Sequence, residues 1–132
     1  MGIMKHDFTF SNRRIIVFAE IKGINDVRQL KFLIDTGASI SVIDDGAARN
    51  LGFDLKQLKS GDRLMTAGGG TNSKILKLPK LNLFGKEMVN FEVSVFNMPS
   101  QITYYVDGII GMDFLMQFKK ITFDFDEKII ET

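Results

Sequence analysis

Short apolar runs and alternating apolar and polar positions recur along the chain, and they predict a protein built mainly of β-strands. Residues 13–21 and 27–34 are rich in β-branched and aromatic side chains, and the segment 23–26 (GIND) between them has the composition of a turn. Two such strands separated by a turn form a hairpin. The second strand ends in the apolar run 32–34 (FLI), directly before Asp35.

The middle of the chain has the pattern of a second hairpin with glycines at its tip. Residues 63–67 and 74–78 flank the triple glycine at 68–70, which predicts a long hairpin with a flexible tip. Further strands are predicted at residues 41–43, 80–84, 89–96, 106–111, 121–125 and 128–130. Short helices are predicted at residues 44–50 and 112–118.

These elements leave no linker, repeat or low-complexity tract, so a single domain over residues 1–132 is expected. Residues 1–12 are expected to form a flexible N-terminal segment. Asp44 is expected to cap the first helix, and Gly52 to stop it. A length of 132 residues suits one domain, and 45% hydrophobic residues suffice for a normal core. The predicted fold class is all-β with one or two short helices.

The charge balance and the missing residue types exclude several classes of function. Lys and Arg total 17 and Asp and Glu total 16, so the formal net charge is +1, whereas nucleic-acid-binding proteins usually have a basic excess. The chain has no cysteine, which excludes a disulfide framework, a thiolate zinc site and a cysteine nucleophile. Because His6 is the single histidine, a Ser-His-Asp triad and a multi-histidine metal site are both disfavoured.

The sequence also lacks the signals of a membrane protein. No apolar run approaches the roughly 18 residues that a membrane-spanning helix needs. Residues 1–7 lack the apolar stretch of a secretion signal. His6 stands where a myristoylation motif starting at Gly2 needs Ser or Thr. We therefore expect a cytoplasmic protein without a membrane partner.

The tripeptide Asp35-Thr36-Gly37 is the strongest candidate for chemistry. Asp35 emerges from a buried strand, where an ionised carboxylate needs hydrogen bonds or a charged partner. Gly37 allows a sharp turn that brings a bare N–H close to this carboxylate, and the hydroxyl of Thr36 can lock the loop. The alternative is an ordinary turn, in which Asp is common. An acid in a tight, donor-rich turn at the end of a buried strand favours a catalytic group.

Four motifs, in this order, resemble those of the retropepsin-like aspartic proteases, the single-domain relatives of pepsin. The matching segments are 32–39 (FLIDTGAS), 41–43 (SVI), the glycine-rich hairpin at 68–70 and 107–115 (DGIIGMDFL). The first and last motifs together are fairly specific, whereas the glycine hairpin by itself is weak. The resemblance covers residues 13–130, and it implies a closed retropepsin-like β-barrel.

The resemblance implies an aspartic endopeptidase that needs no metal and no cofactor. In such enzymes two aspartates share one proton; one carboxylate activates a water, and the other, protonated, donates to the scissile carbonyl oxygen. This chain has one Asp-Thr-Gly, whereas a two-lobed enzyme would need two such tripeptides. The implied assembly is a two-fold symmetric homodimer with Asp35 of each protomer at the axis, and a lone protomer is expected to be inactive.

The same resemblance implies roles for the residues around the acid. Thr36 would contact the partner's loop, Gly37 would donate its N–H to the carboxylate, and Ala38 would complete the active-site loop. The glycine-rich hairpin would be a flap that closes over an extended peptide substrate and excludes water. The residues expected to form the flap or to bind substrate are Met65, Thr66, Gly68, Gly69, Gly70 and Ile110.

The chain departs from the retroviral members of this family at several positions. Those members usually have aspartates after Asp-Thr-Gly-Ala and an arginine after the C-terminal glycine, and these groups pair and help to fix the dimer. Here the positions read Ser39, Ile40 and Met112, so the dimer must be held otherwise; the final hairpin, residues 121–130, is the expected interface. Ala38 replaces a serine of several relatives that could donate to the ionised pair, so activity nearer neutral pH is expected.

Two alternatives stay open at this stage. The first is a catalytically silent retropepsin-like module for dimerisation or peptide binding. The intact Asp35-Thr36-Gly37 favours the enzyme, because a binding module needs no paired acid. The second is a precursor that becomes active after residues 1–12 are removed. A phosphate-binding loop at residues 68–70 is disfavoured, since no Gly-Lys-Ser/Thr follows.

Overall fold

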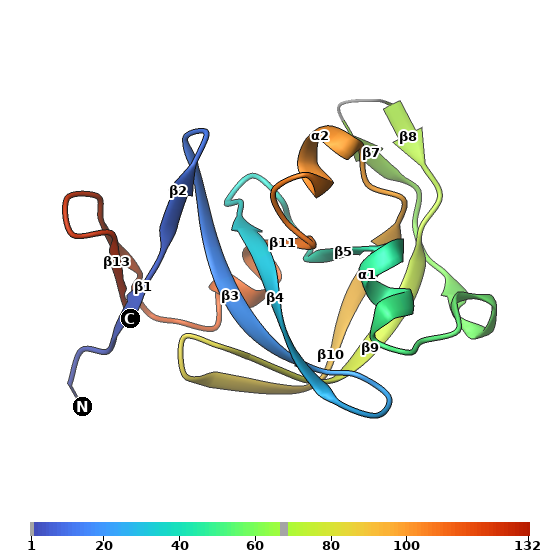
Figure 1. Ribbon diagram of the computed structural model, residues 1–132, viewed down its shortest axis with the longest axis horizontal. Helices are drawn as coiled ribbons and strands as arrows, with labels where there is room; N and C mark the ends of the chain where they lie inside the picture. Colours follow the sequence, from blue (N-terminus) through green and yellow to red (C-terminus); the bar gives the residue numbers. More distant parts are fainter. Residues whose placement is uncertain (1, 67–68) are drawn as a thin grey trace.

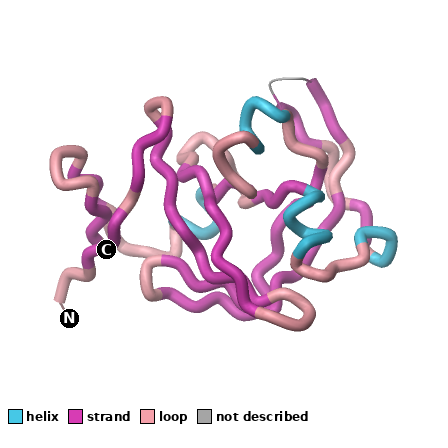
Figure 2. Tube along the Cα trace, viewed as in Figure 1, coloured by secondary structure: helices cyan, strands magenta, loops and turns pink. Residues whose placement is uncertain are grey.

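The computed structural model describes residues 2–66 and 69–132, and strands make up most of its trace (Figures 1 and 2). The strands are β1 (Lys5–Asp7), β2 (Thr9–Ser11), β3 (Arg14–Lys22), β4 (Val27–Ile34), β5 (Val42–Asp44), β6 (Lys59–Ser60), β7 (Leu64–Thr66), β8 (Gly69–Thr71), β9 (Lys74–Leu83), β10 (Lys86–Phe96), β11 (Gly108–Ile110), β12 (Thr122–Asp124) and β13 (Ile129–Glu131). The helices are α1 (Asp45–Asn50), the 3-10 helix η1 (Leu55–Gln57), α2 (Ser100–Thr103) and α3 (Met112–Leu115). In the described part of the chain, no helix has the length and apolar character needed to cross a membrane.

Six strands of the described chain close into a barrel. Hydrogen-bonded neighbours follow the order β3-β4-β11-β5-β10-β9, and β9 returns to pair with β3 through Glu20, Ile21 and Lys22. The pairs β4–β11 and β5–β10 are parallel, and the other pairs of the ring are antiparallel. A closed ring leaves no free barrel edge. This architecture confirms the expected closed all-β barrel with short helices, although the described residues form four of them instead of the one or two expected.

The core of the barrel follows from the alternation along its strands. In β9, Leu76, Leu78, Leu81 and Leu83 are buried, while Lys77 between the first two is exposed. Burial of each such side chain contributes about 1.5–3 kcal/mol relative to leaving it in water. The largest fully buried side chains are those of Phe32, Phe114, Ile21, Ile43, Leu51, Leu78, Leu81, Ile110 and Ile130. The barrel thus has a continuous apolar interior, and the loops of the candidate site connect its strands.

Local signals placed several elements correctly. The strand predicted at 27–34 is β4, and the helix predicted after Asp44 is α1, with Asp44 Oδ2 accepting from Gly46 N at 3.1 Å. The helix predicted at 112–118 is shorter, since α3 ends at Leu115. The final hairpin is confirmed as the antiparallel pair β12–β13.

The glycine-tipped hairpin is shorter than expected. β7 pairs with β8, whereas residues 74–78 belong to β9 and pair with β10. The predicted pairing of 63–67 with 74–78 is therefore wrong. The buried Ser73 closes the base of the short hairpin, because its hydroxyl donates to Asp62 O at 2.6 Å and its carbonyl accepts from Gly61 N at 2.9 Å. After Ser73, the alternating leucines of β9 are buried in the barrel, where β9 pairs with β10 and not with β7.

The N-terminal segment contains two strands that the sequence analysis did not predict. β1 pairs with β13, and β2 pairs with β3, so residues 5–7 and 9–11 join the sheets instead of forming a tail. Phe8 between them is 5% exposed and packs on the core. Figure 1 shows both chain ends beside this small sheet, whose strand order is β1-β13-β12.

Candidate active site

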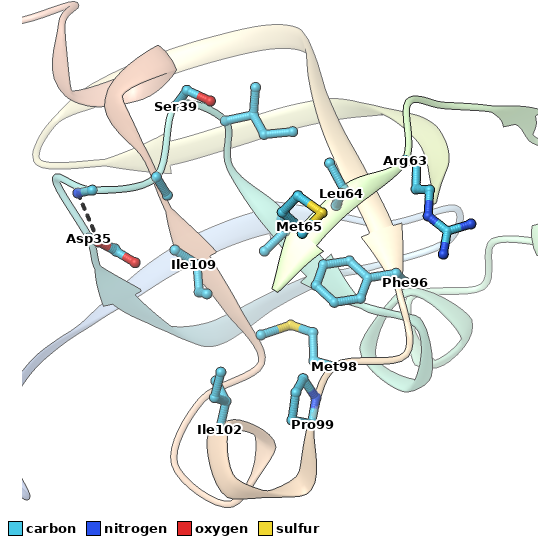
Figure 3. A pocket seen from close by; sticks show the side chains of 14 residues that line it. Asp35, Ser39, Arg63, Leu64, Met65, Phe96, Met98, Pro99, Ile102 and Ile109 are labelled. Carbon is cyan, nitrogen blue, oxygen red and sulfur yellow. Dashed lines mark hydrogen bonds between the residues drawn. The ribbon is translucent and has the colours of Figure 1, made fainter. Parts of the chain in front are cut away.

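Asp35 lies where β4 leaves the barrel, and neighbouring backbone holds its loop. Its N–H donates to Ile110 O on β11 at 3.0 Å, so the parallel β4–β11 pair positions it. Gly37 N donates to Asp35 Oδ1 at 2.9 Å, and Ala38 N donates to Asp35 O at 3.2 Å. The expected N–H of Gly37 is thus placed beside the carboxylate, which Figure 3 shows at one end of a cavity.

The loop after Asp35 is tied to the segment that begins α3. Met112 N donates to Ala38 O at 2.8 Å, and Asp113 N donates to Ser39 O at 3.2 Å. A side-chain pair supports this contact: the fully buried Ser41 donates from its hydroxyl to Asp113 Oδ1 at 2.7 Å. The first and last sequence motifs therefore meet in space and form one unit.

Position 111 requires glycine because the segment before α3 lies so close to the loop that follows Asp35. A Cβ there would lie 2.6 Å from Ile40 O and 2.7 Å from Ala38 O. Contacts this short with backbone atoms cannot be relieved by rotating a side chain. Gly111 thus lets the C-terminal segment approach the loop that carries Asp35.

The cavity beside Asp35 has a volume of about 480 Å³ and mostly apolar walls. Its lining residues are Asp35, Gly37, Ala38, Ser39, Ile40, Val42, Arg63, Leu64, Met65, Phe96, Met98, Pro99, Ile102 and Ile109. Figure 3 shows Met65 of β7 between the Asp35 side and the Arg63 side. An acid with one fixed N–H donor beside an apolar pocket can exchange protons with a bound polar group such as a peptide carbonyl or a water.

Some of the residues predicted for this site lie on the cavity wall, and others do not. Gly37, Ala38 and Met65 line it, whereas Thr36 is exposed outside the lining set. Ile110 is fully buried in the core, and its neighbour Ile109 lines the cavity, because consecutive residues of a strand face opposite sides.

The glycine-rich segment can be placed in part. Gly69 and Gly70 form β8 with Thr71, opposite β7, and both glycines are exposed. Gly68 lies outside the described residues, as does the side chain of Thr66. The β7–β8 hairpin therefore borders the cavity through Leu64 and Met65.

The far wall of the cavity was missed by the sequence analysis. Phe96 ends β10, Met98 and Pro99 lie in the segment after it, and Ile102 lies in α2, which was not predicted. Asp44 Oδ1 accepts from Met98 N at 3.0 Å and fixes this turn beside β5. No local pattern could reveal these residues, because they line the same cavity as Asp35 only after the barrel closes.

Comparison with known proteins identifies the family of this chain. The family model for aspartyl proteases matches residues 19–114, which include Asp35 and the segment at Gly111. The chain belongs to the aspartyl protease family. The expected resemblance to retropepsin-like aspartic proteases is confirmed by solved structures that are similar to this chain.

One of these is a retropepsin-like aspartic protease from Rickettsia conorii, with a TM-score of 0.74 and 25% identity, covering 98% of this chain and 92% of that one. Another is EIAV protease in complex with an inhibitor, with a TM-score of 0.63 and 20% identity, covering 83% of this chain and 92% of that one. An uncharacterized protein of Rickettsia prowazekii (strain Madrid E) is 31% identical over 109 residues, or 81% of this chain. The present chain spans 43% of that relative's length.

Proposed function

We propose that this protease is an aspartic endopeptidase that works as a two-fold symmetric homodimer. The observation that carries the proposal is the position of Asp35 on the wall of a mostly apolar cavity, with Gly37 N at 2.9 Å from its carboxylate. Family membership supports the chemistry, and the single Asp-Thr-Gly supports the dimer. Two Asp35 carboxylates then face each other and share one proton.

In the proposed reaction one carboxylate takes a proton from a water, and the water oxygen attacks the scissile carbonyl carbon. The other carboxyl donates its proton to the carbonyl oxygen, which gives a tetrahedral diol. Collapse of the diol breaks the C–N bond: the ionised carboxylate takes a proton from a diol hydroxyl, and the protonated carboxyl gives its proton to the leaving nitrogen. Gly37 N stabilises the charged carboxylate through its hydrogen bond.

The proposed dimer uses surfaces that are exposed in the single chain. Thr36 and Ile40 of the active-site loop are exposed, as expected for residues that contact a partner's loop. The β12–β13 hairpin is proposed as a further contact, because β12 is an edge strand and Phe125 beside it is 58% exposed. Exposed apolar side chains on a free strand edge favour association with another chain.

The proposed substrate is an extended peptide with apolar side chains near the scissile bond. The cavity presents Val42, Phe96, Met98 and Ile102 to such side chains. The β7–β8 hairpin borders the cavity and is the proposed flap, and Met65, 83% exposed on β7, is proposed to be covered by substrate. Closing over the peptide would exclude water from the dyad.

The test is digestion of a fluorogenic peptide library by wild type and by Asp35→Asn. We expect cleavage by wild type and a loss of at least about 10³-fold with Asp35→Asn, because an amide cannot serve as the proton-transferring acid or base. Cleavage that is equal in both proteins would show a contaminating protease. No cleavage by a dimeric wild type at any pH from 3 to 8 would favour the silent peptide-binding module instead.

A tethered dimer separates the dyad from other roles of Asp35. Two copies of the chain joined by a flexible linker should be active, and the same molecule with Asp35→Asn in one copy should be inactive although half of its carboxylates remain. Analytical ultracentrifugation of the untethered chain should show dimers at micromolar concentration. Full activity of the singly substituted tethered molecule would rule out a shared dyad.

A further inference from the structure

The cavity beside Asp35 has a second charged side chain at its opposite end. Arg63 lies just before β7, and Figure 3 shows its guanidinium across the cavity from Asp35, with Leu64, Met65 and Phe96 between them. Arginine keeps its positive charge at all ordinary pH values. The cavity is therefore apolar in its middle, with an acid at one end and a fixed cation at the other.

Arg63 has no acidic partner among the residues that the structure describes. The ion pairs in that part of the chain join Arg28 to Asp26, Arg49 to Asp45 and Lys80 to Glu87. The hydrogen bond of Arg63 goes from Nη2 to Gly70 O at 3.4 Å, which is long for this type of bond. A guanidinium has five N–H donors, so most of them remain available to a ligand.

Gly70 keeps this guanidinium alongside the hairpin. A Cβ at position 70 would lie 2.5 Å from Arg63 Nε and 3.1 Å from Arg63 Nη2. The absence of a side chain therefore lets Arg63 pack against β8 at the edge of the cavity. Arg63 is exposed and lines the cavity, so its guanidinium is accessible to a ligand there.

We propose that Arg63 determines specificity by binding an acidic side chain of the peptide substrate. This inference rests on the proposed function, since it assumes that a peptide occupies the cavity. A carboxylate and a guanidinium form paired, charge-assisted hydrogen bonds, which a neutral amide cannot match. Side chains of an extended peptide alternate in direction, so one that points toward the β7 end would meet Arg63.

The two-fold symmetry of the proposed dimer gives this inference a distinctive consequence. Each half of the cleft carries one Arg63, so an acidic residue is favoured on both sides of the scissile bond. The preferred substrates are peptides in which Glu or Asp flanks an apolar cleavage site. A lysine at the same position would be disfavoured by like-charge repulsion.

The test scans one cleaved host peptide with Glu, Gln or Lys at each position on either side of the scissile bond. We expect kcat/KM for Glu to exceed that for Gln by about threefold to tenfold at one position on each side, with the ratio shrinking at high salt. Arg63→Gln should bring the Glu-to-Gln ratio of kcat/KM to about one. Arg63→Glu should reverse the charge preference, so that the Lys peptide is cleaved better than the Glu peptide. Arg28→Gln, an exposed arginine outside the cavity lining, should leave the ratio unchanged.

The outcomes separate this inference from the proposed function. Cleavage by wild type with equal kcat/KM for Glu and Gln everywhere would overturn the role of Arg63 while leaving the endopeptidase intact. A Glu preference that survives Arg63→Gln would do the same. If no peptide is cleaved, fluorescence anisotropy of the labelled Glu and Gln peptides decides: tighter binding of the Glu peptide that Arg63→Gln abolishes supports the inference, and equal binding overturns it.

Discussion

Asp113 accepts two hydrogen bonds from Ser41, one from its hydroxyl at 2.7 Å and one from its backbone N–H at 3.0 Å. The same hydroxyl accepts from Gly111 N at 3.0 Å. These bonds connect the end of the active-site loop to the start of α3. A carboxylate that accepts several hydrogen bonds locks its donors more firmly than a neutral acceptor does.

Replacing Asp113 should loosen the loop that carries Asp35. In Asp113→Ala the N–H and hydroxyl of Ser41 lose their acceptor in a buried setting, at a cost of about 2–4 kcal/mol in the free energy of unfolding. Urea denaturation measures this loss. Asp126→Ala, at an exposed turn, is the control and should stay within about 0.5 kcal/mol. Equal stability of the two variants would contradict the proposed tie.

Gly111→Ala should damage both stability and peptidase activity. The added methyl group would press on Ile40 O and Ala38 O at 2.6 and 2.7 Å, so the loop must move. Overpacking of this kind costs about 1–3 kcal/mol. The matched control is Gly2→Ala, because a Cβ at Gly2 has nothing within 4 Å. Thermal melts and peptide cleavage of both variants provide the test, and a fully active Gly111→Ala would refute the close-approach argument.

Ala38→Ser should move the activity profile to lower pH. Ala38 lines the cavity in the loop of Asp35, and a hydroxyl at this position could donate to the ionised dyad, which favours the charged form. We expect the acidic limb of kcat/KM against pH to shift by about half a pH unit or more. Ala38→Val, which adds bulk without a donor, is the control. If the acidic limb of the pH profile is at the same pH in Ala38→Ser as in wild type, this prediction is contradicted.

His6 makes the stability of the folded chain sensitive to acid. Burial lowers the pKa of His6, whose Nε2 lies 3.2 Å from Thr132 Oγ1 in the sheet of the two chain ends. The unfolded chain therefore binds a proton first as the pH falls. Stability attributable to His6 is retained above about pH 6.5 and is lost as the pH drops below it. Urea denaturation at pH 7.5 and 5 should show a larger loss for wild type than for His6→Gln; parallel losses would exclude this contribution.

The exposed aromatic cluster at the β12–β13 turn should contribute to dimer formation. Phe125 stacks on Phe10 with ring centroids 5.7 Å apart and remains 58% exposed. In the proposed dimer, Phe125→Asp should weaken self-association by tenfold or more, and activity should recover at high protein concentration. Phe18→Asp, a phenylalanine of 53% exposure on β3, is the control. Sedimentation velocity across a dilution series measures this self-association. If both variants dissociate like wild type, the prediction is contradicted.

Local chemistry was sufficient for the elements that lead into the site. The apolar residues of β4 and the turn at Asp35 were predicted correctly, as was the capping of α1 by Asp44, because each depends on neighbours within a few residues. The Gly37 N–H donor followed from the same local turn geometry. The pairing partner of β7 was predicted wrongly, because β8 (Gly-Gly-Thr) has no apolar alternation that marks it as a strand, whereas residues 74–78 have the apolar character of a strand but pair within the barrel.

The sequence by itself determined the identity of the acid, the donor beside it and the all-β class, because turn chemistry and side-chain alternation act over short distances along the chain. Only the tertiary structure decided that Ser41 hydrogen-bonds to Asp113, that Ile109 rather than Ile110 lines the cavity, and that Arg63 lines the same cavity as Asp35. These residues are far apart in the chain: the hydrogen-bonded Ser41 and Asp113 are separated by 72 positions. Barrel closure sets the strand register, and a shift of one residue would turn every side chain of a strand to its other face.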